Sequence, residues 1–456
     1  MSSPGVWAAR DPERASVVIT DTGATVTYRQ LDERSNRLAH LRRAEGPDAH
    51  VAILMDNNDH YHEVVWSAKR SGRYFTPVNR HLSPAEAAYI IEDCGATVLV
   101  TSSAMAELAN ALTDLIPGVA RRLCVGGGVD GWEDYYEAVS VHAATPVQDE
   151  TEGEMLQYSS GTTGRPKGIR RALTGKPLAL ENDNVLPFLR MMGFPEGGIY
   201  LTPAPLYHSA PVSWSTSVHR LGATSVVMPR FDPEDFLRTV EHYRVTHAQL
   251  VPTMFVRMLK LPVDVRERYD VSSLRRVIHA AAPCPVEIKA AMLDWWGPII
   301  DEFYSSTEGA CATYITPDEW RAHPGSVGRP LLGEPHIVGP DGADVPTGEV
   351  GQIWLANASA FSYLHDDAKT AEAHDAAGRT TVGDIGYLDD RGLPLPHRPQ
   401  ELHDHLGRRQ HLSARGRGPA RRPSEGHGRG GDRGPRRRDG RAGQGRRAAP
   451  PPEHCR

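Results

Sequence analysis

A polar loop with one lysine follows the strand-like segment Met155–Tyr158. It reads YSSGTTGRPKG over residues 158–168. Glycines and other small residues let backbone N–H groups converge on a phosphate, hydroxyls add donors, and a lysine adds a mobile positive charge. The Walker pattern G-x-x-x-x-G-K-[ST] does not occur in the chain. The residues that could hold a polyphosphate here are Ser159, Ser160, Gly161, Thr162, Thr163, Gly164 and Lys167. A flexible polar linker is the alternative for such a composition.

This loop resembles, along its whole length, the phosphate-loop signature of the adenylate-forming family of AMP-dependent synthetases and ligases, acyl-CoA synthetase type. Further motifs of that family follow in order: LTPAPLYHS at 201–209, AAAPCP at 280–285, DEFYSSTEG at 301–309 and TTVGDIGY at 380–387. Ala280 and Ser305 stand where the family commonly has glycine. The resemblance covers roughly residues 10 to 392, and the ordered set of motifs is more specific than any one of them.

The resemblance implies a role for particular residues in each motif. The implied roles are His208 near the acyl and phosphate sites, Ala281, Ala282 and Pro283 along adenine, Tyr304 stacked on adenine, Thr307 bonded to the α-phosphate, Glu308 as a ligand of Mg²⁺, and Asp384 bonded to the ribose hydroxyls. Oxygen ligands suit magnesium, and one carboxylate can accept two hydrogen bonds. Taken singly, each motif has a structural alternative: a core histidine, a small-residue loop, a strand-to-turn segment or an acidic surface turn.

The same resemblance implies ATP, Mg²⁺ and CoA as the partners of a two-step reaction on a small carboxylic acid. The carboxylate attacks the α-phosphate of ATP to give an acyl-adenylate and pyrophosphate, and the CoA thiol then attacks the acyl carbon and releases AMP. The protein contributes alignment and electrostatic relief of phosphate charge rather than a covalent nucleophile. Cys284 and Cys311 are therefore not proposed as catalytic residues.

The sequence does not identify the acid. Val212, Trp214 and Met254 could line its pocket or pack in the core. Two other interpretations stay open. One is another adenylate-forming enzyme, such as a carrier-loading adenylation domain, although no carrier module with an exposed serine follows. The other is a non-catalytic remnant that binds ATP and the acid.

Strands and helices alternate through the N-terminal part, which predicts an α/β fold of helix-covered sheets over residues 1–332. Capping boxes at Thr27 and Ser83 predict helix starts, and residues 51–55 and 97–101 are short apolar strands. From residue 333 to 392 short strands alternate with turns, which indicates a small β-rich subdomain.

Composition favours a soluble, cytoplasmic protein. The chain has 456 residues, of which 39% are hydrophobic, and it contains no apolar run long enough to span a membrane. Its five cysteines form no CxxC pair, which argues against a disulfide framework or a zinc site. No nucleic-acid partner is expected, and the oligomeric state is unknown.

Residues 393–456 differ from everything before them. They contain 16 Arg, no Lys and 6 acidic residues, a balance of +10, and they lack Val, Ile, Phe, Met, Trp and Tyr. Such a segment cannot form a packed core alone and is expected to be disordered. The family places a hinge and a small C-terminal domain with a catalytic lysine at this point, and neither has a match here.

We hypothesise a shift of one nucleotide just after Gly392 as the cause of this change. If Leu393–Gln400 is encoded CTA CCT CTA CCT CAC CGA CCG CAA, loss of the first C gives codons for YLYLTDR, a family-like hinge. Codons compatible with the rest of the tail can spell the beginning of a C-terminal domain in the same frame. The hypothesis is therefore an out-of-frame tail and impaired activity. A genuine basic tail that binds nucleic acid or an acidic surface is the alternative.

Overall fold

The computed structural model describes residues 3–46, 49–159, 165–180 and 183–396, all within one compact unit of the chain. The residues Ser160, Gly161, Thr162, Thr163 and Gly164 of the phosphate loop lie outside the described residues.

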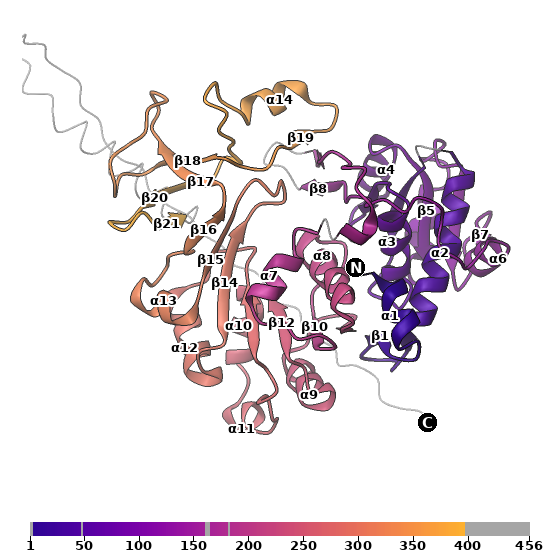
Figure 1. Ribbon diagram of the computed structural model, residues 1–456, viewed down its shortest axis with the longest axis horizontal. Helices are drawn as coiled ribbons and strands as arrows, with labels where there is room; N and C mark the ends of the chain where they lie inside the picture. The colour runs from indigo at the N-terminus through magenta and orange to yellow at the C-terminus, as the bar shows by residue number, and fades with distance from the viewer. Residues whose placement is uncertain (1–2, 47–48, 160–164, 181–182, 397–456) are drawn as a thin grey trace, which may run out of the picture. The chain divides into compact units, whose positions relative to one another are not determined.

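The N-terminal region folds around a parallel sheet of strand order β4-β3-β5-β6-β7. Its strands are β4 (Phe75–Pro77), β3 (His50–Leu54), β5 (Ala96–Ser102), β6 (Arg121–Val125) and β7 (Glu133–Asp134). The helices α2 (Tyr28–Ala44), α3 (Tyr61–Arg70) and α4 (Pro84–Asp93) surround it in Figure 1. Thr27 and Ser83 form the predicted capping boxes at the starts of α2 and α4, so both helix starts are confirmed.

The larger sheet has the order β16-β15-β14-β13-β12-β10-β11-β1-β2 among the described residues. Its parallel centre consists of β11 (Thr224–Val227), β10 (Ile199–Thr202), β12 (His247–Leu250), β13 (Arg276–His279) and β14 (Ile300–Ser305). The remaining strands are β1 (Ala15–Ile19), β2 (Thr25–Thr27), β15 (Ala312–Ile315) and β16 (Arg329–Leu332). Because the carboxyl ends of parallel strands share one edge, the segments that follow β10, β12, β13 and β14 gather there. Three of the predicted motifs are in these segments.

Helices cover both faces of this sheet. The helices α9 (Pro233–Tyr243), α10 (Pro252–Leu259) and α12 (Val286–Trp296) pack in one apolar cluster with β12 and β13. On the other face, α7 (Leu186–Met191) and α8 (Ser209–Ser217) pack with Tyr200 and Ile278. The predicted α/β class with helix-covered sheets is confirmed.

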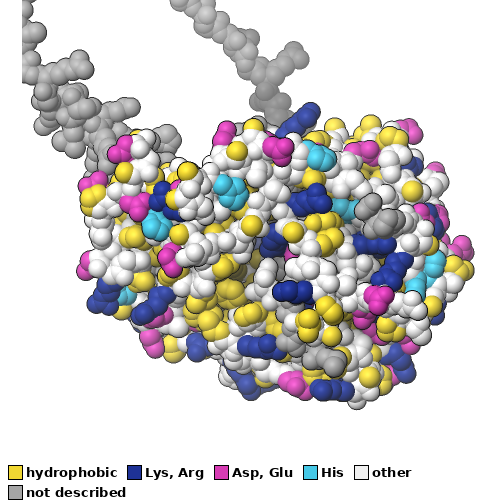
Figure 2. All heavy atoms as spheres, turned by 45° about the horizontal axis from the view of Figure 1, so that its top comes forward, with side chains coloured by type: hydrophobic (Ala, Val, Ile, Leu, Met, Phe, Trp, Pro, Cys, Tyr) yellow, Lys and Arg dark blue, Asp and Glu magenta, His cyan; other side chains and the backbone are white. Residues whose placement is uncertain are grey.

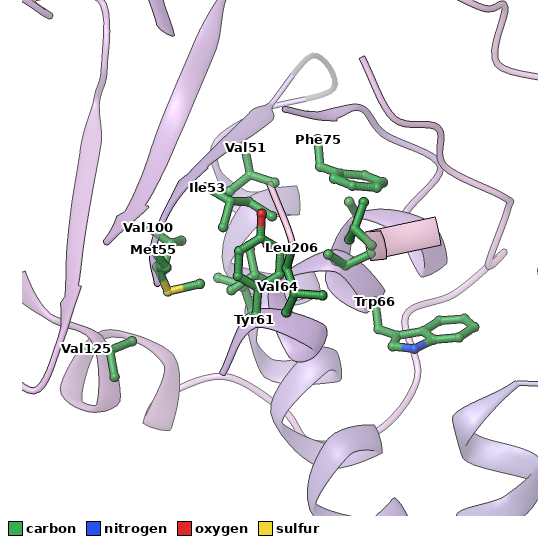
Figure 3. Packing of buried hydrophobic residues seen from close by; sticks show 14 of the residues in the cluster. Val51, Ile53, Met55, Tyr61, Val64, Trp66, Phe75, Val100, Val125 and Leu206 are labelled. Atoms are coloured by element: carbon green, nitrogen blue, oxygen red, sulfur yellow. The ribbon is translucent and has the colours of Figure 1, made fainter. Parts of the chain in front are cut away.

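The apolar core is continuous between the N-terminal sheet and the larger sheet. One cluster includes Val51 and Tyr61 from the N-terminal region together with Leu206, Val212 and Val227. Figure 3 shows Leu206 against Tyr61 and Val64 within this cluster. The segment before α8 is therefore fixed by packing from both sheets.

Two small sheets complete the described structure. The strands β8 (Gln157–Ser159) and β9 (Lys167–Arg170) form an antiparallel pair, and β19 (Ser362–Tyr363) adds to β9. The other sheet has the order β17-β18-β20-β21, with bounds Glu334–Val338, Gly351–Ala356, Ile385–Leu388 and Pro394–Pro396. The helix α14 (Asp367–Glu372) follows β19.

The edge strand β21 carries two prolines, which suits an edge because proline has no N–H for a further strand. This strand is within the stretch assigned to the tail, so regular structure continues past Gly392. The domain boundary at residues 332 and 333 stays a prediction. None of the helices in the described ranges has the length and apolar character needed to cross a bilayer.

Candidate functional site

A cavity of about 1040 Å³ opens at the carboxyl edge of the larger sheet. Its lining includes five of the predicted site residues, namely His208, Ala281, Thr307, Glu308 and Asp384. The molecular face in Figure 2 is hollowed, and hydrophobic side chains gather in the hollow. Segments more than 170 residues apart in the sequence thus contribute to one site, from His208 to Asp384.

Thr307 and Glu308 lie two and three residues after the end of β14 at Ser305. The Glu308 side chain is buried, with 8% of the residue exposed, and Tyr363 Oη donates a hydrogen bond to its Oε1 at 3.0 Å. Burial, together with the neighbouring Glu308 carboxylate, raises the pKa of Tyr363, so its phenol stays protonated and remains the donor. No local sequence pattern indicates Tyr363, because β19 is brought to Glu308 through its pairing with β9.

Lys167 lies beside the same tyrosine. It is the cross-strand partner of Ser159, so both residues stand where the hairpin of β8 and β9 meets its loop. Lys167 Nζ is 5.6 Å from the ring centroid of Tyr363 and 4.0 Å from Asp366 Oδ2. Neither Ser159 nor Lys167 lines the cavity, but Tyr363 connects Lys167 to Glu308.

His208 immediately precedes α8 and has extended backbone at the helix N-cap. Its ring centroid is 4.5 Å from that of Tyr207, and the side chain is open to the cavity. The surrounding protein displaces water from the ring and lowers the pKa of His208. A neutral imidazole can accept or donate a hydrogen bond, which suits contact with a carboxylic acid or its adenylate.

Of the predicted adenine and ribose residues, Asp384 and Ala281 line the cavity, and Tyr304 does not line it but contacts Asp384. Tyr304 Oη donates a hydrogen bond to Asp384 Oδ2, and this joins β14 to the segment before β20. Ala281 lines the cavity with a φ of 73°, whereas Ala282 and Pro283 are exposed and do not line it. The Ala281 side chain is only a methyl group, and this small size fits the close approach of a flat base.

An aromatic wall faces the other part of the cavity. Ring centroids are 6.4 Å apart for Phe188 and Trp214, 6.3 Å for Phe188 and Phe303, and 5.7 Å for Trp214 and Phe303. Val212 and Met254 also line the cavity, although both are buried. Val212 and Met254 therefore belong both to the cavity wall and to the buried core. Phe188 and Phe303 were not among the sequence candidates.

The acidic and other metal-binding side chains of the described residues show whether the site fits a Mg²⁺ ion. No group of three or more His, Cys, Asp or Glu side chains within the described ranges is arranged to hold a metal ion. Mg²⁺ is usually bound through one or two carboxylates and the phosphates of a substrate. A single buried carboxylate at Glu308, connected through Tyr363 to Lys167, fits that mode.

Comparison with known proteins gives a consistent result. The sequence model of the family described as AMP-binding enzyme matches residues 6–364. The feruloyl-CoA synthase of Amycolatopsis sp is 31% identical over 401 residues, which are 85% of this chain and 77% of that protein. The fatty acid–[acyl-carrier-protein] ligase ScoC of Streptomyces coeruleorubidus is 29% identical over 391 residues, which are 81% and 71% of the two chains.

Among solved structures, the N-terminal domain of FACL13 from Mycobacterium tuberculosis has a TM-score of 0.73 at 22% identity. The match covers 87% of this chain and 98% of that domain. At this identity the likeness shows a shared fold.

Proposed function

Because the chain belongs to the AMP-binding enzyme family of adenylate-forming ligases, we propose that it activates an aromatic carboxylic acid with ATP and transfers the acyl group to CoA. The single observation that carries this proposal is the cavity itself. One part is lined by His208, Thr307, Glu308 and Asp384, and another by three aromatic rings. Offset and edge-to-face contacts between aromatic rings favour a flat ring over a flexible chain.

In the first step, the residues of the chain align the acid carboxylate with the α-phosphate. Neutral His208 orients the carboxylate, the Thr307 hydroxyl donates to the α-phosphate, and Lys167 offsets phosphate charge near the hairpin. Asp384 and Tyr304 position the ribose and adenine. Glu308 would hold Mg²⁺, which supplies charge neutralisation on the phosphates when bound.

In the second step, a thiol attacks the acyl carbon of the adenylate and AMP leaves. CoA is the acceptor that we propose, and a carrier protein is the second candidate because one relative is an acyl-carrier-protein ligase by name. We also propose that the segment after Gly392 is read out of frame. That segment has no match to the family's catalytic lysine, so turnover would be impaired. If the impairment is complete, the protein binds ATP and the acid but does not catalyse either step.

Three measurements test the proposal. Thermal shift with ATP and a panel of fatty, aromatic and steroid-like acids tests binding. ATP–pyrophosphate exchange tests adenylation, and AMP release with CoA or a carrier protein tests thiol transfer. We expect ATP and aromatic acids to raise the melting temperature together, with slow exchange. Stabilisation by fatty acids alone contradicts the aromatic assignment, and an exchange rate equal to that of a full-length relative contradicts impairment.

Sequencing of the encoding DNA tests the frame shift separately. We expect a C-terminal domain to be readable in the adjacent frame just after the codon for Gly392. An intact frame through that codon, with no such domain in the next frame, contradicts the hypothesis. A frame-corrected protein should then gain thiol transfer.

A further inference from the structure

The hairpin of β8 and β9, which carries Lys167, is held from outside the cavity by one carboxylate. Tyr158 on β8 is buried, and its Oη donates a hydrogen bond to Asp93 Oδ2 at 2.5 Å. Asp93 is the last residue of α4, and it does not line the cavity. Burial raises the pKa of Tyr158 well above its ordinary value, so the phenol remains the donor. The strand β8 is therefore fastened to α4, which lies beside it in Figure 1.

The ring of Tyr158 connects this hydrogen bond to the backbone next to Lys167. Tyr158 is the cross-strand partner of Gly168. A Cβ atom on Gly168 would lie 3.0 Å from Tyr158 Cζ and 3.1 Å from its Oη, so the ring passes closely over the glycine. The absence of a side chain at Gly168 thus leaves room for the phenol to reach Asp93.

Asp93 also faces the segment that follows β19. His365 Nδ1 lies 3.5 Å from Asp93 Oδ1, the carboxylate oxygen that does not accept from Tyr158. In the same segment, the Leu364 N–H donates to the carbonyl oxygen of Gly168 at 2.7 Å. The sheet order β19-β9-β8 places β9 in the middle. Asp93 therefore contacts the chain on both sides of β9, the strand that begins with a lysine.

We propose that Asp93 is a positioning residue for the polyphosphate of ATP: through Tyr158 it fixes the hairpin so that Lys167 faces the β- and γ-phosphates. The assignment rests on the proposed function, because it requires the hairpin to bind phosphate. It goes further in naming a residue that acts from outside the cavity and through another side chain.

AMP is the informative comparison for this role. It keeps the adenine, the ribose and the α-phosphate, to which Tyr304, Asp384 and Thr307 are assigned in the proposed function, but it lacks the β- and γ-phosphates. A misplaced hairpin should therefore weaken the binding of ATP and spare that of AMP. A general loosening of the fold should weaken both.

The test measures the Kd of ATP and of AMP calorimetrically on the full chain, with Mg²⁺ and without acid, so that no adenylate forms. We expect wild type to bind ATP more tightly than AMP. Asp93→Leu removes both carboxylate oxygens and should raise the Kd of ATP about tenfold, and that of AMP by less than about twofold. Asp93→Asn removes the same charge but keeps an oxygen that can accept from Tyr158, so it should stay within about threefold of wild type for both nucleotides.

Tyr158→Phe removes the donor without changing any charge, and it should raise the Kd of ATP as Asp93→Leu does. Tyr136→Phe is the matched control. Tyr136 Oη lies at a hydrogen-bond distance of 2.8 Å from His60 Nε2, and neither residue lines the cavity. This variant loses a hydrogen bond of the same kind and should keep the wild-type Kd for both nucleotides.

An undiminished preference for ATP in Asp93→Leu overturns the assignment, and so does an equal loss for ATP and AMP. Equal effects of Asp93→Asn and Asp93→Leu would also overturn it, because charge rather than the hydrogen bond would then be responsible. If Asp93→Leu does not fold, Tyr158→Phe decides by the same comparison. If wild type binds ATP no more tightly than AMP, only this inference fails. If neither nucleotide binds, the proposed function fails and this inference with it.

Discussion

At the scale of single residues, Glu308 and Tyr363 form a hydrogen-bonded pair in the site. The carboxylate is buried and accepts one hydrogen bond, from Tyr363 Oη, among the described residues. Lys167 lies over the face of the same tyrosine ring. A carboxylate held in this way is oriented before substrate arrives, which is what a ligand for a phosphate-bound cation requires.

Glu308→Gln tests the proposed metal role. The substitution keeps the shape and a hydrogen-bonding oxygen but removes the charge, so we expect pyrophosphate exchange to fall on the order of 100-fold. Tyr363→Phe removes only the orienting hydrogen bond and should cost about tenfold. Circular dichroism of both variants checks the fold. Exchange by Glu308→Gln at the wild-type rate contradicts the assignment of Glu308.

At the scale of elements, the turn between β13 and α12 is strained at one residue. Ala281 has a φ of 73°, in the left-handed region that glycine adopts without a Cβ penalty. Ala281→Gly should therefore stabilise the fold by about 0.5–1 kcal/mol, after the entropic cost of glycine is subtracted. Chemical denaturation measures the change.

Ala282→Gly is the control for this turn, because Ala282 is exposed and does not have a positive φ. The expected effect there is neutral or destabilising. Equal effects of the two substitutions would mean that the left-handed conformation of Ala281 carries no cost.

A second element-scale feature is a buried ionic network next to the cavity. The Arg220 side chain, on the turn after α8, is fully buried and pairs with Glu152 at 2.6 Å and with Asp183 at 3.0 Å. Lys69 on α3 pairs with Glu152 at 2.9 Å. Lys69 and Asp183 also line the cavity, so the network links the N-terminal helices to its wall.

Arg220→Met should destabilise the protein by about 3–5 kcal/mol, because it removes the ion-pair partner of the buried Asp183 and leaves the buried Glu152 with Lys69 alone. Arg238→Met is the matched control at an exposed ion pair with Asp235, and it should change stability by less than about 1 kcal/mol. Similar losses in the two variants would show that the buried network does not depend on Arg220.

The elements show which parts of this fold follow from local sequence. The starts of α2 and α4 were predicted because Thr27 with Gln30 and Ser83 with Glu86 satisfy the helix ends within four residues. Tyr363 could not be predicted, because its place in the site depends on the pairing of β19 with β9. The sequence motifs therefore predict the site residues themselves. Their hydrogen-bond partners, such as Tyr363 for Glu308, depend on strand pairing between distant segments.

At the scale of the whole described fold, the core holds several histidines in a neutral state. His219 is fully buried between the two sheets. Trp66 Nε1 donates to its Nδ1 at 3.1 Å, and its Nε2 lies 3.0 Å from the carbonyl oxygen of Ser16. This arrangement accommodates one ring proton, on Nε2. Desolvation lowers the pKa of His219 to about 4, and burial likewise lowers the pKa of His50 to about 3.

These histidines predict an acid-labile core. Below a pH of about 6.5 the unfolded chain binds a proton at each site and the folded chain does not, so the free energy of unfolding falls as pH decreases toward 4. For His219 alone the loss between pH 7 and pH 5 is about 2 kcal/mol. Urea denaturation at pH 7, 6 and 5 measures how the free energy of unfolding changes with pH. His219→Gln should reduce this dependence by the contribution of about one bound proton, and it should lower the stability at pH 7. His81→Gln, at an exposed ring, should follow the wild-type profile. A wild-type slope that survives in His219→Gln would place the proton uptake elsewhere in the core.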